Sequence, residues 1–108
     1  HDLRTGSSTD GATMELDLGE VDGAPNNHLG VYIPPGVAHG FASITDMTIT
    51  YMVDSYYNPA DELGVAWDDP EIGADWGVSD PILSARDQEN PRRSDIGLQW
   101  QPHVALRT

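Results

Sequence analysis

The stretch VYIPPGVAHGF, residues 31–41, decides how this chain is expected to fold. Its apolar start is typical of a strand. The Pro-Pro-Gly triplet that follows predicts a tight turn, because proline fixes φ and glycine admits backbone angles closed to other residues. His39 comes three residues after the glycine, where the next strand is expected to begin. The pattern therefore predicts a rigid turn that delivers one imidazole to a fixed place.

Hydrophobic alternation on both sides of this turn predicts an all-β chain. Short apolar or alternating segments are separated by clusters of turn residues, which is typical of a sandwich or barrel. The expected strands are residues 12–18, 29–33, 39–44, 47–54 and 63–67, and the expected turns are residues 22–27, 45–46 and 58–61. Beyond them, Ser84 is expected to cap one helical turn. Alternation also places Tyr51 on one strand face with apolar neighbours, pointing into the barrel.

Length and charge restrict the class of protein. A chain of 108 residues forms one domain at most. Its net charge is -13 and all five basic residues are arginine, so nucleic acid and anionic membranes are poor partners. There is no cysteine, which excludes disulfides and thiolate chemistry. No apolar run approaches a membrane span and no signal peptide is visible, so the cytoplasm is the expected location.

The run Pro34 to His39 has the form Pro-x-Gly-x-x-His, which resembles the second motif of the cupin β-barrels. With Gly40-Phe41 after it and Tyr51 twelve residues beyond His39, it resembles the dTDP-4-dehydrorhamnose 3,5-epimerase family in particular. Further matching pieces follow the family's order from about Asp2 to Pro91. They are DLRTGSST at 2–9, YMVDSYYNP at 51–59, Glu62 with DPEIGADW at 69–76, and LSARD at 83–87.

The resemblance implies a fold and an assembly. It implies a cupin double-stranded β-helix (a jelly-roll barrel), incomplete at the N-terminus because family members are nearly twice as long, with short C-terminal helical turns. We expect residues 1–96 to be the C-terminal portion of this domain and residues 97–108 to be a tail. Family members are dimers, so a homodimer is expected.

The resemblance also implies a reaction. The substrate would be a dTDP-4-keto-6-deoxyhexose, epimerised at C3 and C5 through an enolate on the path to dTDP-L-rhamnose. No cofactor is expected, since the substrate's own carbonyl takes up the charge. The family's catalytic base is a histidine in an Arg-Gly-x-His motif, which this chain lacks. We expect that base upstream of His1, and the 108-residue chain alone to be inactive or nearly so.

Two residues occupy the family's catalytic positions. Tyr51 matches the catalytic tyrosine, although a core aromatic is the ordinary role for a strand tyrosine. A phenol, with a reference pKa of about 10, stays protonated at neutral pH and can return a proton to a carbanion. Asp87 matches the carboxylate that orients the catalytic histidine, although a solvated surface acid is the common alternative in so acidic a chain.

Four other residues are implied to contact the substrate. His39 is expected near the sugar or its diphosphate, with a hydrogen-bonded barrel histidine as the alternative. Glu62 and Arg86 match nucleotide-sugar contacts, and a planar guanidinium suits a diphosphate. Tyr57 either stacks on the thymine or is a structural aromatic. A metal site is not expected, because the histidines lack ligand spacing and a metal normally needs three or four protein ligands.

Three other functions stay open at this point. A close relative in an antibiotic sugar pathway would act at one carbon only, and Tyr51 with Asp87 would serve either reaction. A non-catalytic nucleotide-sugar-binding cupin would bind the ligand without proton exchange. A metal-dependent cupin isomerase or dioxygenase would need ligands that this chain does not show.

Overall fold

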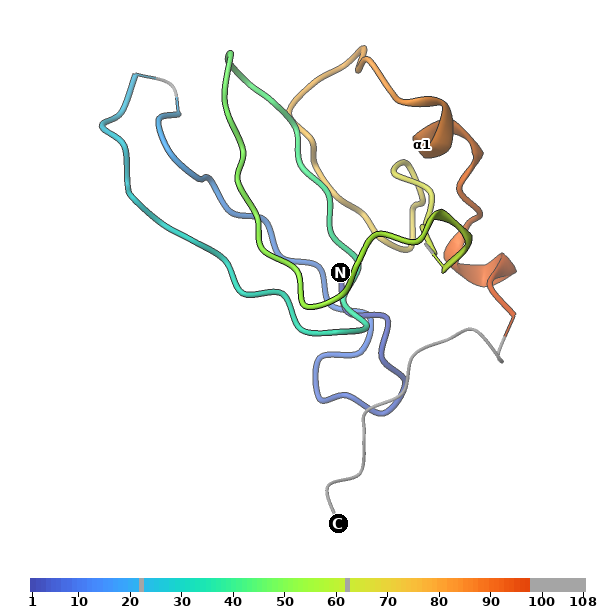
Figure 1. Cartoon of the computed structure of the whole chain (residues 1–108). Helices are drawn as coiled ribbons and strands as arrows, with labels where there is room; N and C mark the ends of the chain where they lie inside the picture. The colour runs from blue at the N-terminus through green and yellow to red at the C-terminus, as the bar shows by residue number, and fades with distance from the viewer. Residues whose placement is uncertain (22, 62, 98–108) are drawn as a thin grey trace.

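The computed structural model describes residues 1–21, 23–61 and 63–97 (Figure 1). Its helical elements are short and lie late in the chain: the 3-10 helix η1 (Pro59–Asp61), the α-helix α1 (Ala85–Glu89) and the 3-10 helix η2 (Arg93–Asp95). The expected tail falls outside the described residues except for Gly97.

The expected strands are wrong as hydrogen-bonded elements, although the chain is mostly extended. No residue in the described ranges is assigned to a strand, and the β pairing recorded there is one isolated antiparallel bridge between Asp2 and Val37. Figure 1 shows two hairpin-shaped excursions, the first running from blue to teal and the second in green. Alternation predicts an extended backbone, but a stable sheet also needs paired strands with one face buried against a second layer.

Many apolar side chains of these hairpins are exposed in the described structure. Apolar side chains of the expected strands are largely in solvent within the described structure, including those of Met14, Leu16, Leu29, Ile49 and Val53. Tyr51, expected to point into a barrel, is 76% exposed. The buried apolar side chains of the described residues are Ala66 and Ile72, each 8% exposed. Within the described residues, little free energy from apolar burial is therefore available to hold the extended segments together.

The expected turn at Pro-Pro-Gly is confirmed. The amide of Val37 donates to the carbonyl of Pro34 at 3.2 Å, which closes a four-residue turn. Pro35 and Gly36 occupy its central positions, and Gly36 has a φ of 87°, a value that glycine adopts without steric cost. The turn therefore forms for the local reason that its residue types predict, and it sets the position of His39.

A buried carboxylate anchors this turn to the start of the chain. Asp2 is 5% exposed, and its carboxylate accepts hydrogen bonds from the amide and guanidinium of Arg4 and from the hydroxyls of Ser7 and Thr9. Arg4 thus has a structural role. The carbonyl of Gly36 accepts a hydrogen bond from the Leu3 amide at 3.3 Å. The motif resembling the family's first turn is therefore a carboxylate-centred loop that holds the Pro-Pro-Gly turn in place.

A second buried carboxylate organises the acidic turn after Trp67. Asp69 is 3% exposed and accepts hydrogen bonds from the backbone amides of Glu71 and Arg93. These bonds, with the Arg93 amide as the main contributor, lower the pKa of the Asp69 carboxyl. The Ala66 amide also donates to the Pro91 carbonyl at 2.7 Å. Together these bonds dock residues 66–73 against the segment that follows α1.

The helical turn capped by Ser84 is confirmed. The Ser84 side chain accepts from the Asp87 amide at 3.1 Å, and its hydroxyl donates to the Asp87 carboxylate at 2.7 Å. This reciprocal pair satisfies a backbone donor that a helix N-terminus otherwise leaves without a partner. The start of helix α1 is therefore stabilised by local hydrogen bonds between Ser84 and Asp87.

Candidate functional site

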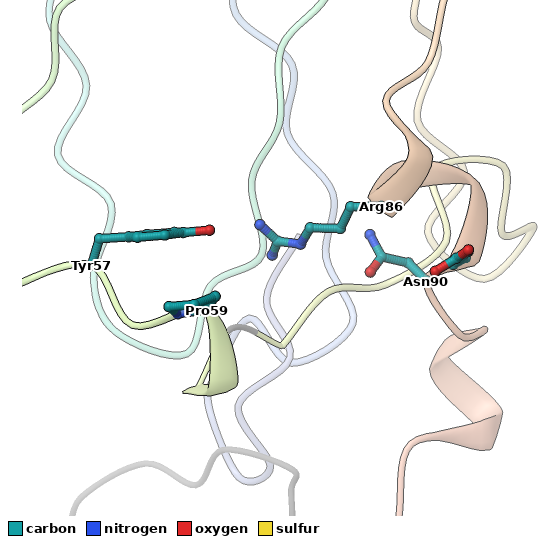
Figure 2. Close-up of a pocket in the computed structure, with 5 residues that line it drawn as sticks. Tyr57, Pro59, Arg86 and Asn90 are labelled. Carbon is teal, nitrogen blue, oxygen red and sulfur yellow. The ribbon is translucent and has the colours of Figure 1, made fainter.

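An open pocket of about 410 Å³ lies between α1 and the segment that leads into η1. Its lining residues are Tyr57, Pro59, Arg86, Glu89 and Asn90. Figure 2 shows the ring of Tyr57 and the guanidinium of Arg86 pointing toward one another across this pocket. The structure therefore brings together two of the six residues expected at the site, an aromatic platform and a cation.

Asn90 lines the pocket and packs against a glycine. It is the C-cap of α1, and its amide donates to the Arg86 carbonyl at 3.1 Å. A Cβ built on Gly64 would lie 2.3 Å from Asn90 Oδ1 and 2.6 Å from Nδ2. The Asn90 carboxamide therefore packs directly on the backbone of Gly64, in space that any side chain would fill. This contact fixes α1 against residues 64–66.

Substituting Gly64 with alanine should disturb the pocket without unfolding the protein. The new methyl group displaces the Asn90 carboxamide, and an induced clash of this kind typically costs about 1–3 kcal/mol. We expect lower stability in urea and weaker binding of any pocket ligand, measured by calorimetry. Gly30→Ala is the matched control, because a Cβ at Gly30 meets nothing within 4 Å. Equal behaviour of the two variants would contradict the packing role of Gly64.

His39 lies next to a tryptophan contact. Its own side chain is exposed, but a Cβ on Gly40 would lie 3.0 Å from the Trp76 ring. The indole nitrogen of Trp76 donates to the Trp67 carbonyl at 2.9 Å, which fixes the ring, and both tryptophans are half-buried. Both tryptophans therefore have a packing role in this part of the structure. Gly40 allows the ring to lie against the backbone beside His39.

The two expected catalytic residues are exposed and do not line the pocket. Tyr51 lies on the second hairpin, and Asp87 caps its own helix through Ser84. The structure records no hydrogen bond between Asp87 and His1, His28 or His39. Glu62, expected to contact the nucleotide sugar, lies outside the described residues. The described chain thus presents an open pocket and, separately, the side chains of Tyr51 and Asp87 that were expected to carry the chemistry.

Nothing in the described part of the chain resembles a metal centre. Within residues 1–21, 23–61 and 63–97, no group of three or more His, Asp or Glu side chains is arranged to hold a metal ion. Nor does any helix of those ranges have the length and apolarity needed to cross a membrane.

Comparison with known proteins identifies the family. The family model described as dTDP-4-dehydrorhamnose 3,5-epimerase matches residues 1–95. The chain belongs to this family. All six residues expected at the site lie within the matched range.

Curated members of the epimerase family support the assignment. The chain is 32% identical to dTDP-4-dehydrorhamnose 3,5-epimerase of Sinorhizobium fredii over 93% of this chain and 50% of that protein. It is 40% identical to dTDP-4-dehydrorhamnose 3-epimerase of Streptomyces niveus, over 82% of this chain and 41% of that protein. A third relative, the 3,5-epimerase of Methanothermobacter thermautotrophicus, is 37% identical over 83% of this chain and 51% of that protein.

The chain spans about half the length of these curated relatives. No solved structure matches it. Sequence relatives therefore establish the epimerase family. The geometry of the pocket is known from this structure alone.

Three lining residues of the pocket were not among the expected site residues: Pro59, Glu89 and Asn90. A signal for two of them was present. Glu89 and Asn90 follow Arg86 by three and four residues, and such neighbours share one face of a helical turn. The expected helix at Ser84 could have placed both beside Arg86. Pro59 carried no comparable signal, because its position depends on how η1 approaches α1.

Proposed function

We propose that the protein containing this chain is an epimerase of a dTDP-4-keto-6-deoxyhexose that inverts C3 and C5 by removal and return of a proton. The observation that carries the proposal is membership of the 3,5-epimerase family over residues 1–95. Supporting it, Tyr57 and Arg86 line one pocket, where a ring and a guanidinium suit a nucleobase and a diphosphate.

The reaction uses the substrate's own carbonyl. A 4-keto group acidifies the hydrogens on C3 and C5, because the electron pair left by the departing proton can be held as an enolate. In this proposal Tyr51 donates a proton to the carbanion on the face opposite the base. Asp87 orients the histidine that acts as the base. His39 and Glu62 contact the nucleotide sugar, and no redox step is needed.

The fold proposed for the intact domain is the cupin jelly roll, and the assembly is a homodimer. The many large apolar side chains exposed on both hairpins support this, since so many exposed apolar residues are normally covered in the folded protein. The dimer and the barrel would each supply the second layer that the described residues do not provide.

Solvent exchange tests the function directly. The full-length gene product is incubated in heavy water with the 4-keto-6-deoxyglucose nucleotide, and deuterium at C3 and C5 is read by NMR. Incorporation at both carbons is the expected result. Binding of the nucleotide sugar without any exchange would refute the enzyme and support a non-catalytic binding cupin.

A single-centre epimerase is the second candidate, favoured by one observation. The relative with 40% identity, from Streptomyces niveus, is named a 3-epimerase. Deuterium at C3 alone in the same experiment would establish this alternative. The same two catalytic residues would serve either reaction, so the outcome depends on how the pocket orients the sugar.

A further inference from the structure

Glu89 places a negative charge in the pocket that is proposed to hold a diphosphate. It lines the pocket together with Arg86, three residues earlier on α1. Side chains three residues apart on a helix are surface neighbours, with Cβ atoms about 5–6 Å apart. Because Glu89 lines the same pocket as Arg86, a ligand phosphate bound in that pocket also experiences the negative charge of Glu89.

The formal charges of the described lining residues cancel. Arg86 is the cation and Glu89 the anion, while Tyr57, Pro59 and Asn90 are neutral. The surrounding chain carries a net charge of -13 and contains no lysine. Among the described residues, the pocket is therefore not built to gather anions strongly, as a site rich in lysine and arginine would be.

We propose that Glu89 is a specificity-determining residue that lowers the pocket's affinity in proportion to the negative charge of the ligand. This rests on the proposed function. A nucleoside diphosphate linked to a sugar carries fewer negative charges than the free nucleoside diphosphate, whose terminal phosphate ionises further. Repulsion by Glu89 therefore penalises the free nucleotide more, and the pocket discriminates for the sugar-linked diester.

Glu89→Gln removes this charge and keeps the shape of the side chain. The full-length gene product and its variant are titrated with thymidine diphosphate by calorimetry at low ionic strength. Because both the carboxylate and the ligand are exposed to water, we expect a gain in affinity of about threefold for thymidine diphosphate. The gain should be smaller for the sugar-linked diester and should shrink when salt is added. Neutral thymidine should bind the two proteins equally.

Glu20→Gln is the matched control. It makes the same chemical change and removes the same charge, but Glu20 is exposed on the first hairpin, and the blue segment that carries it lies across the molecule from α1 (Figure 1). This variant reports the effect of net charge alone. A gain confined to Glu89→Gln supports the proposal.

Four results would overturn it. Equal gains in affinity for thymidine diphosphate in Glu89→Gln and Glu20→Gln would show that the effect comes from the net charge of the whole protein. An equal gain for thymidine and thymidine diphosphate would assign it to packing. A wild-type protein that binds the nucleotide sugar, with affinity unchanged in Glu89→Gln, would refute the role of Glu89 and leave the proposed function intact. A protein that binds neither thymidine diphosphate nor the nucleotide sugar refutes the proposed function and this inference with it.

Discussion

Replacing Tyr51 with phenylalanine is expected to lower deuterium exchange and turnover by about 100-fold or more in the full-length gene product. General acid catalysis by a positioned side chain contributes typically 10²–10⁴-fold, and the substitution removes only the hydroxyl that would supply the proton. Tyr51 is 76% exposed, so losing that hydroxyl leaves no buried polar group without a partner. Stability should therefore stay unchanged while the rate falls. Exchange followed by NMR and unfolding followed in urea measure the two effects.

Tyr32→Phe is the control for this prediction. Tyr32 is also a largely exposed tyrosine on an extended segment, but it lies outside every proposed site. The same loss of one hydroxyl there should leave exchange unaltered. Near-normal exchange in Tyr51→Phe would show that another group returns the proton.

Asp2→Asn is expected to destabilise the fold by about 2–3 kcal/mol. Asp2 Oδ2 accepts from the Arg4 guanidinium and from the hydroxyls of Ser7 and Thr9, and Oδ1 accepts from the amide and Nε of Arg4. An asparagine keeps one acceptor oxygen and turns the other position into a donor, which faces groups that are themselves donors. Breaking a buried hydrogen-bonded charge pair from one side is costly for this reason. Urea unfolding of the full-length protein gives the loss in free energy.

Asp10→Asn provides the comparison, because it makes the same change in a more exposed ion pair. Asp10 accepts from Arg93 Nη2 at 2.8 Å, and such surface pairs contribute no more than about 1 kcal/mol. Similar losses in the two variants would contradict the view that Asp2 organises the loop.

The pH dependence supplies a second check on Asp2. Hydrogen bonds from Arg4, and then from Thr9 and Ser7, hold the pKa of the Asp2 carboxyl well below its usual range despite burial. Below the ordinary aspartate pKa of about 3.9, the unfolded chain therefore takes up a proton that the folded chain does not. The advantage of wild type over Asp2→Asn should be full above that pH and should shrink as the pH falls further.

Local structure was predictable where a few neighbouring residues determine it. The turn at Pro35 and Gly36 is closed by a hydrogen bond between residues three apart, and Ser84 caps a helical turn through contacts of the same range. The family, too, was recognisable from short motifs in the right order. The hydrogen bonds from Arg4 to Asp2, two residues earlier, are equally local.

The strands were not predictable in the same way. Alternation in residues 47–54 indicates an extended backbone with an apolar face, and the backbone there is indeed extended in Figure 1. Whether such a segment becomes part of a sheet depends on a neighbour at hydrogen-bonding distance and on burial of the apolar face. Both are properties of distant residues, and neither is encoded within the segment itself.

By itself, the sequence determined the family, the Pro-Pro-Gly turn, the capped helix and the residue types available for chemistry. Tertiary structure alone decided that Asn90 packs on Gly64, that Tyr57 faces Arg86, and that Glu89 shares their pocket. The physical reason is the range of the interactions. A turn or cap is closed by hydrogen bonds within three or four residues, whereas the pocket joins segments about thirty residues apart, whose approach depends on how the intervening chain packs.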